Sequence, residues 1–491
     1  MKRIFTWMLV VAMMFSGCGQ QAQPAEPDPA PDELPSDAII IDLSDSGITC
    51  DSDAVYTAND IVYYESGKGF TYGEGTEADA HSAEEAVTHT VVHITQPGTY
   101  ALQGQLSKGQ IAVDLGEDAE GDPNAVVTLI LNGVDITCEV APAVIFYNVY
   151  ECGSTDTETA SKDVDTSAAG ANVYITEGTT NYVNSSYVAR IYKPDSVELN
   201  EDGTEVADAK KLHKYDAAFY SKMSMNVDGG ENGSLHIKAE NEGLDSELHL
   251  TINGGAISII SGNDGINTNE DGVSVTTING GELSILVTGE TGEGDGIDSN
   301  GWLVINGGKV IAAACSNSAD AGIDSDMGIH INSGTVIATG HMLDHIEDGG
   351  QNYAVFNYSA AQSGDDIVTL KNESGKDLMS HLPQNDYSVL IYSSPELTEG
   401  EYTLWSGDTR LSVSSGRMGS GFGGGVRPGG MMPGGERPEP PEGMMRPAEQ
   451  RPEPPEGMVG GRPNGFKDRN AGGEASETVN IVKGGNLFGV Q

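Results

Sequence analysis

The sequence predicts an all-β protein whose main domain is a parallel β-helix with three short strands in each coil and a small C-terminal β cap. Three observations predict this class. The chain has 65 glycines and only 6% aromatic residues, a composition typical of turn-rich β structure. A repeat of about 26 residues runs through its centre, and no stretch carries the spacing of a long amphipathic helix.

Two motifs recur between residues 233 and 340. The first is an Ile-Asn-Gly-Gly turn, or Ile-Asn-Ser-Gly in its last copy, and its asparagines are 26, 27 and 26 residues apart: Asn253, Asn279, Asn306 and Asn332. The second, written Asp-Gly-Ile in its commonest form, closes each unit and has its glycines at Gly243, Gly265, Gly296 and Gly322. A coil of this length buries its apolar side chains against the next coil. Leucine-rich repeats need a regular Leu-x-x-Leu-x-Leu frame that is absent here, and a β-propeller blade needs about 40 residues.

The N-terminal residues predict export. Lys2 and Arg3 precede an apolar run, and Ser16-Gly17-Cys18 resembles a bacterial lipobox, in which the cysteine is lipidated. Residues 1–18 are therefore expected to be a lipoprotein signal peptide, with a non-lipidated signal or an uncleaved anchor as alternatives. Residues 19–38, rich in Pro and acids, are interpreted as a linker. We expect an extracytoplasmic protein that is lipid-anchored to the cell membrane or cell surface.

The rest of the chain is divided by composition. The β-helix domain is expected over residues 39–409, with its clearest coils at 233–340 and a β cap from about residue 365. Two polar segments, 154–169 and 194–214, are interpreted as surface excursions. Residues 416–473 are a low-complexity insertion rich in Gly, Pro and Met that cannot form a core. Residues 476–491 are expected to supply the terminal strand of the cap.

Charge and cysteine content limit the classes of partner. With 25 basic and 74 acidic residues the formal charge is −49, which repels nucleic acid and anionic lipid and attracts cations. The cysteines after Cys18 fit no zinc motif. A disulfide between Cys138 and Cys152 and buried free thiols are both compatible with an exported protein.

The acids of the second motif are predicted to bind calcium. If Ile266, Ile297 and Ile323 point into the coil, the next residue of each copy points outward, which gives one row on stacked coils: Asp245, Asn267, Asp298 and Asp324. Neighbouring carboxylates repel one another, and residues 239–308 contain no Lys or Arg to compensate. Calcium accepts several carboxylate and amide oxygens in irregular geometry. The alternative is that these residues only satisfy turn conformations. The expected metal ligands are Asp245, Asp264, Asp295, Asp298, Asp324 and Asp326.

Several stretches resemble the carbohydrate-binding parallel β-helix family of bacterial surface lipoproteins, of the clostridial type that binds cellulose and polygalacturonate. The residues that carry the resemblance are 90–104, 127–136 and 216–222 together with the coil motifs. It extends over about residues 39–405 and implies a right-handed β-helix similar to pectate lyases, bound calcium, and affinity for cellulose or acidic plant polysaccharides. The family's coil motif often continues Ser-Lys-Asp, and that Lys is absent from every coil here.

The sequence therefore predicts a calcium-dependent binder of cellulose-like or uronic-acid polysaccharide, with no catalytic residues. A pectate-lyase-like enzyme would need a base as well as a metal, and Lys238 and Lys309 are interpreted as exposed strand charges. An adhesin that binds another protein is the third hypothesis.

The loop at 340–348 resembles a metal site only loosely and is interpreted as a solvated loop. The sequence does not identify the sugar-binding residues, and the aromatic candidates for stacking on sugar are Tyr63, Tyr64, Tyr182, Tyr187, Tyr192 and Trp302.

Overall fold

The structure is a computed structural model that describes residues 34–61, 81–192, 198–199, 206–208, 211–416 and 475–491. Within these ranges nearly every regular element is a β-strand, and the exceptions are the short helix α1 (Ala83–Ala86) and the 3-10 turn η2 (Glu117–Gly121). The all-β prediction is confirmed. None of the described helices has the length and apolar character needed to cross a membrane. Cys18, residues 1–33 and residues 417–473 lie outside the described residues.

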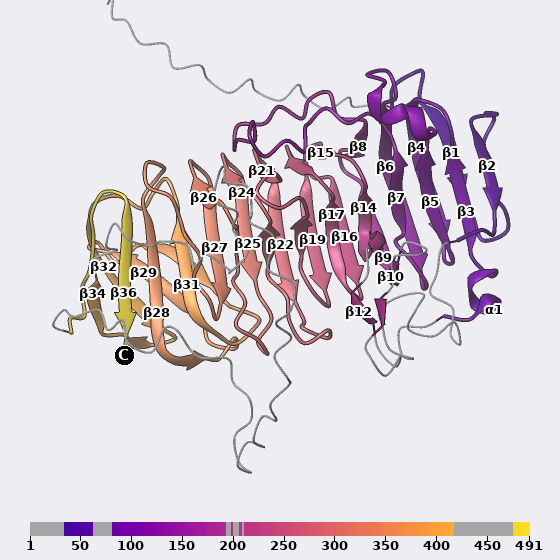
Figure 1. Cartoon of the computed structure of the whole chain (residues 1–491). Helices are drawn as coiled ribbons and strands as arrows, with labels where there is room; N and C mark the ends of the chain where they lie inside the picture. Colours follow the sequence, from indigo (N-terminus) through magenta and orange to yellow (C-terminus); the bar gives the residue numbers. More distant parts are fainter. Residues whose placement is uncertain (1–33, 62–80, 193–197, 200–205, 209–210, 417–474) are drawn as a thin grey trace, which may run out of the picture.

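Three ladders of parallel strands run along the molecule, and consecutive coils lie side by side in Figure 1. The first ladder contains β3 (Thr90–Ile94), β5 (Gly109–Asp114), β7 (Val144–Asn148), β14 (Ala217–Ser221), β17 (Glu242–Ser246), β20 (Ile266–Thr268) and β23 (Ile297–Ser299). β2 (Val55–Ala58) adds an antiparallel strand at its N-terminal edge.

The second ladder contains β4 (Gly98–Leu106), the first half of β6 (Val127–Cys138), β8 (Ala171–Ile175), β15 (Met225–Gly229), β18 (His249–Ile252), β21 (Val275–Ile278), β24 (Trp302–Ile305) and β26 (Gly328–Ile331). The third ladder contains the second half of β6, β9 (Thr180–Ser185), β16 (Ser234–Ala239), β19 (Ala256–Ser261), β22 (Glu282–Val287), β25 (Lys309–Ala313) and β27 (Thr335–Gly340). β1 (Ile39–Leu43) pairs in parallel with β4 at the N-terminal end.

The C-terminal part of the chain changes to antiparallel pairing, so the sheets are mixed. β31 (Tyr387–Ser393) lies antiparallel to both β27 and β28 (Tyr353–Gln362), and β34 (Val413–Gly416) lies antiparallel to β36 (Gly485–Val490), which is itself parallel to β28. A separate five-stranded antiparallel sheet contains β29 (Val368–Asn372), β30 (Asp377–His381), β32 (Gly400–Ser406), β33 (Thr409–Arg410) and β35 (Val479–Ile481). Two hairpins, β10 (Val188–Tyr192) with β13 (Lys211–Tyr215) and β11 (Glu198–Leu199) with β12 (Val206–Asp208), lie outside these sheets.

The repeat of the sequence sets the register of the coils. Ile252, Ile278, Ile305 and Ile331 are paired across successive strands of the second ladder and are buried. The asparagines that follow them stack, because the Nδ2 of each donates to the Oδ1 of the asparagine one coil earlier, at 2.9, 2.9 and 2.8 Å. The last glycine of each turn has φ between +75° and +88°, a conformation that glycine adopts without strain.

The glycines of the second motif are required for a different reason, which is close packing between coils. A Cβ on Gly265 would overlap Ile285 and the carbonyl oxygen of Gly296, and a Cβ on Gly296 would overlap the carbonyl oxygen of Gly322. The backbone of each coil therefore approaches the next without room for a side chain.

One continuous apolar core lies between the three ladders, and a smaller one lies under the C-terminal sheet. Aliphatic side chains alternate inward along each strand, as Ile257 and Ile259 do in β19. The cysteines at 50, 138, 152 and 315 are all free thiols. The alternative of a Cys138–Cys152 disulfide is therefore wrong.

Candidate functional site

Three of the predicted ligands form a compact group, which we call the outer acidic cluster. Oxygen atoms of Asp295, Asp298 and Asp324 lie within 4.8 Å of one another. Asp298 is in β23, Asp295 precedes that strand, and Asp324 belongs to the next coil, where its backbone N–H donates to Ile297 O at 2.7 Å. All three side chains are half-buried. The Asp-Gly-Ile motif thus brings the acids of two coils to one point.

Burial and mutual repulsion make ionisation of this cluster costly. Burial, and then the neighbouring acids, raise the pKa of Asp295 well above its ordinary value. Burial, with Asp344 and Asp298 next, raises the pKa of Asp324 to about 8. Asp264 lies beside the cluster, where its Oδ1 accepts the Asp295 N–H at 2.7 Å, and burial also raises its pKa strongly. Near neutral pH these carboxyl groups therefore either keep protons or need a bound cation.

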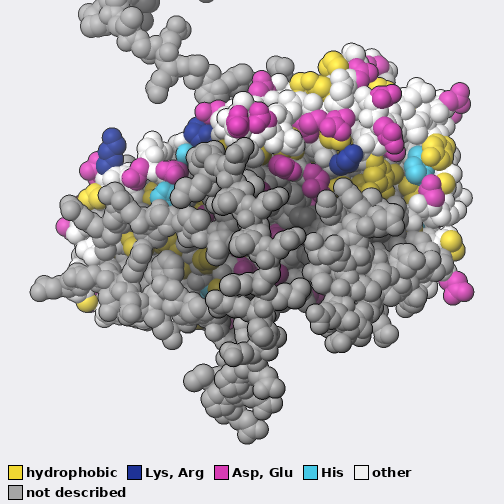
Figure 2. Space-filling model, viewed as in Figure 1, with side chains coloured by type: hydrophobic (Ala, Val, Ile, Leu, Met, Phe, Trp, Pro, Cys, Tyr) yellow, Lys and Arg dark blue, Asp and Glu magenta, His cyan; other side chains and the backbone are white. Residues whose placement is uncertain are grey.

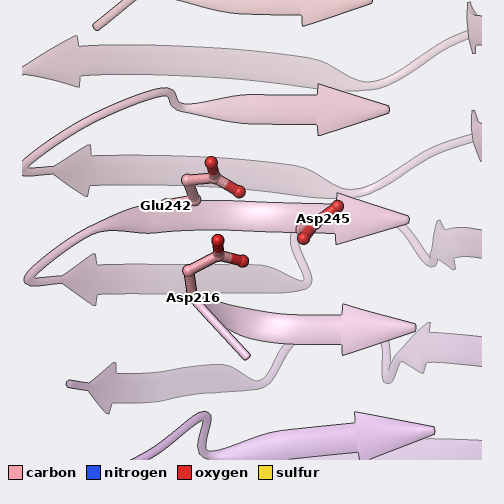
Figure 3. A group of neighbouring side chains, drawn as sticks. All are labelled: Asp216, Glu242 and Asp245. Carbon is pink, nitrogen blue, oxygen red and sulfur yellow. The ribbon is translucent and has the colours of Figure 1, made fainter. Parts of the chain in front are cut away.

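A second group of acids is more deeply buried, and we call it the inner acidic cluster (Figure 3). Asp216 precedes β14, and Glu242 and Asp245 stand on β17; their side chains are 6%, 5% and 0% exposed. Asn267 Nδ2 donates to Glu242 Oε1 at 3.1 Å, and Asn269 Nδ2 donates to Asp245 Oδ1 at 2.6 Å. Among the described residues, no hydrogen-bond donor reaches Oδ1 of Asp216.

The structure divides the predicted ligand set. Asp295, Asp298 and Asp324 lie together with Asp264 beside them, Asp245 belongs to the inner cluster, and Asp326 is exposed and lies in neither group. Asp245, Asn267 and Asp298 are paired across successive strands of the first ladder, as the row requires, but Asp245 is fully buried and Asn267 is 7% exposed. Only the end formed by Asp298 and Asp324 is partly open to solvent.

Sequence reasoning missed three acids. Asp216 and Glu242 did not enter the predicted ligand set, because Asp216 precedes a strand outside the clear repeats and Glu242 replaces the Asp that begins the commonest form of the second motif. Asp344 lies in the 340–348 loop, which the sequence suggested was only solvated. Its Oδ2 accepts the Ser325 N–H at 3.1 Å, and its charge is the largest acidic influence on the pKa of Asp324. The recurrence of Asp one coil after Asp324 was the signal that would have found it.

The basic residues considered as catalytic bases lie on the surface. Lys222 and Lys238 are exposed, and Lys309 Nζ is 3.9 Å from Glu282 Oε1 across neighbouring strands of the third ladder. On the face shown in Figure 2, many acidic and few basic side chains are visible. Lys238 and Lys309 are surface strand charges, as the sequence suggested, and Lys222 directly follows β14.

The aromatic candidates are distributed over different parts of the molecule. Tyr182 is 48% exposed, and its ring stacks on His236 with 5.1 Å between centroids. Trp302 and Tyr187 are half-buried. Tyr63, Tyr64 and the side chain of Tyr192 lie outside the described residues. The described candidates do not form one continuous aromatic strip.

Comparison with known proteins identifies the family to which this chain belongs. The model of a family described as "Carbohydrate-binding domain-containing protein" matches residues 88–353, more than half of the chain. The chain belongs to this carbohydrate-binding family. A curated relative with the same description, from Acetivibrio thermocellus, is 28% identical over 176 residues, which is 35% of this chain and 46% of that protein. The chain therefore matches about half the length of that relative.

One solved structure is also similar. It is described as "polysaccharide lyase-like protein from C. thermocellum, Gadolinium derivative", and the alignment covers 61% of this chain and 90% of that chain. The two are 20% identical, with a TM-score of 0.36.

Proposed function

We propose that this protein is a cell-surface lipoprotein that binds cellulose-like or uronic-acid polysaccharide through a right-handed parallel β-helix, with calcium held at its acidic clusters. The family to which the chain belongs supports the carbohydrate-binding part. The outer acidic cluster is the observation that carries the calcium-dependent part, because it brings carboxylate oxygens of three residues within 4.8 Å of one another.

The β-helix assignment is supported by the order of the ladders. Between β14 and β25 each coil contributes one strand to the first ladder, one to the second and one to the third, in that order along the chain. Each ladder pairs a strand with its counterpart one coil later and in parallel. This is the connectivity of a solenoid in which each coil contacts its neighbours. Lipidation at Cys18 is supported by the sequence around that residue alone.

Calcium fits both acidic clusters chemically. Hard cations of this kind take six to eight oxygen ligands from carboxylates, amides and water. At the outer cluster Asp295, Asp298 and Asp324 would be protein ligands, and Asp264 and Asp344 would orient the neighbouring backbone through the amide hydrogen bonds that they accept. At the inner cluster the unpartnered Oδ1 of Asp216 and the Oδ1 of Asn267 are the free acceptors. A bound cation would compensate the repulsion at either cluster, and at the outer cluster, which is partly open to solvent, it would also bridge to a carboxylate of an acidic glycan.

The lyase hypothesis is less well supported than binding. Removal of the C5 proton of a uronate requires a base at the metal, and the lysines considered for this role, Lys238 and Lys309, are exposed residues on strands of the third ladder, whereas the acidic clusters lie along the first ladder. No observation favours the adhesin hypothesis over carbohydrate binding.

A glycan array tests this proposal. The purified protein is applied to cellulose-derived, pectic and unrelated glycans with calcium and with EDTA, and the same samples are incubated with polygalacturonate while the absorbance of an unsaturated product is followed. We expect binding to cellulose-like or pectic glycans, with calcium-dependent retention on polygalacturonate and no absorbance rise. A steady rise in absorbance would contradict the binder and establish a lyase, and no binding to any glycan would refute the carbohydrate function.

A further inference from the structure

A polar groove lies on a different side of the coils from the acidic clusters. It has a volume of about 520 Å³ and lies between the excursion at residues 154–169 and the outward side of the second ladder. In Figure 1 this excursion is the purple loop near β15 and β21. The sequence predicts only a surface excursion for residues 154–169, and in the structure this segment forms the roof of the groove.

The floor of the groove is a row of outward side chains in strict register. Asn226, Thr251, Thr277 and Val304 are paired one coil apart through β15, β18, β21 and β24. The stacked asparagines at positions 253, 279, 306 and 332 form one wall. Successive coils are about 4.8 Å apart, so this wall is about 14 Å long, which is the length of a short oligosaccharide.

Hydrogen bonds fix the roof at one end of the groove and leave the other end open. Thr166 Oγ1 donates to Asn226 Oδ1 at 2.8 Å and lies 2.7 Å from Thr251 Oγ1, and Asn226 Nδ2 donates to Thr166 O at 2.8 Å. Thr166, Asn226 and Thr251 are all at least nine-tenths buried. The groove is therefore built before a ligand arrives, with Thr277 as an open part of its floor.

The lining favours a neutral ligand that is rich in hydroxyl groups. The two inner asparagines of the wall, Asn279 and Asn306, each use one N–H and one oxygen lone pair in the stack, which leaves a second N–H and a second lone pair for a ligand. At the roof, Lys162 Nζ and Asp163 Oδ1 are 2.5 Å apart and neutralise each other, and Asp165 adds a further carboxylate that disfavours an anionic ligand. Hydroxyl groups of sugars both donate and accept, so they match a wall that presents donors and acceptors at every coil.

From this lining we propose that the groove binds a single chain of neutral polysaccharide, laid across the coils along the asparagine wall, and that this binding does not require calcium. The inference rests on the proposed carbohydrate function and deepens it by assigning neutral glycans to the groove and acidic glycans to the acidic clusters.

The test uses the full chain and hydroxyethyl cellulose, a neutral soluble β-glucan, in affinity electrophoresis with EDTA at mildly acidic pH. Thr277→Trp fills the groove, and Lys162→Ala changes a half-buried residue of the roof that lies outside every strand and helix. Ser284→Trp is the matched control, since Ser284 points outward from the third ladder in the same coil. The melting temperature of each variant verifies folding, and polygalacturonate with calcium is the second ligand.

We expect the wild type to bind hydroxyethyl cellulose in EDTA, Thr277→Trp to weaken this binding at least tenfold and Lys162→Ala several-fold, and Ser284→Trp to leave it unchanged. Calcium-dependent binding of polygalacturonate should be the same in all four proteins. Two results would refute the assignment of neutral glycans to the groove and leave the proposed function standing. One is undiminished binding of hydroxyethyl cellulose by folded Thr277→Trp, and the other is a wild type that binds polygalacturonate but not hydroxyethyl cellulose. A wild type that binds neither glycan would overturn both.

Discussion

Neutralising two acids of the outer acidic cluster is expected to have opposite effects on stability with and without calcium. Two unit charges 4.8 Å apart repel by about 3 to 4 kcal/mol at the effective dielectric constant of a protein surface. The outer cluster holds three such charges when all are ionised. Since a native protein is stable by only about 5–15 kcal/mol, this repulsion must be relieved by protons or by a cation.

The pKa values of the cluster determine whether the stability of the fold rises or falls with pH. The carboxyl group of Asp324 has a pKa of about 8 in the fold against an ordinary value of 3.8. Between these values the native state binds more protons than the unfolded chain, so stability falls as pH rises from about 4 to 8. Each pKa unit corresponds to about 1.4 kcal/mol, which makes the loss several kcal/mol in the absence of metal. Calcium should restore this stability, because it binds only the ionised cluster of the folded state.

The perturbation is Asp298→Asn combined with Asp324→Asn, followed by thermal unfolding at several pH values with EDTA or with calcium. In EDTA at pH about 8 the double variant should be more stable than the wild type, because the repulsion is removed. With calcium the order of stability should reverse. Calcium at about 100 times its Kd adds about 2.7 kcal/mol to the free energy of unfolding of the wild type, whereas the variant, which lacks two of the ligands, should gain little stability.

The control removes two exposed acids, Glu282→Gln with Glu293→Gln, for the same change in net charge. It should show the calcium response of the wild type. A double variant at 298 and 324 that keeps the full calcium increment would refute the assignment of the metal to the outer cluster.

Three further outcomes follow from the fold and the site. Gly296→Ala should destabilise the protein by about 1 to 3 kcal/mol in urea unfolding, because its Cβ would overlap the carbonyl oxygen of Gly322; a neutral result would mean that the coils are less closely packed. Deletion of residues 417–473 should leave the melting temperature and glycan binding unchanged, since their composition cannot supply a core. Asn306→Ala should cost about 1 to 2 kcal/mol by removing two hydrogen bonds of the stack, and an unchanged midpoint would show that the stack contributes nothing.

The coil register could be predicted from the sequence because it is written there as a repeat. The spacing of Asn253, Asn279 and Asn306 gave the position at which successive strands pair, and the structure has those residues hydrogen-bonded to one another. Inward-facing Ile266 and Ile297 followed from alternation along a strand, and both are fully buried. A repeated local rule transfers from one coil to the next without any knowledge of long-range contacts.

The site was only partly predictable, because burial depends on what lies over a coil. Alternation placed Asp245 and Asp298 on the same side of the strand, yet Asp245 is fully buried and Asp298 is half-buried. Asp216 and Asp344 lie outside the regular repeat, so a motif search does not reach them. The groove escaped prediction for the same reason, since the contact of Thr166 with Thr251 joins residues 85 positions apart.

The most direct test of the account is a calorimetric titration of polygalacturonate into the full chain, first with calcium and then with EDTA, at a pH where the protein is folded in both. A chain with a charge of −49 should repel a polyuronate unless cations bridge the two. We predict measurable binding with calcium, none with EDTA, and recovery when calcium is added back. Equal affinity in calcium and in EDTA would contradict the calcium-bridged site.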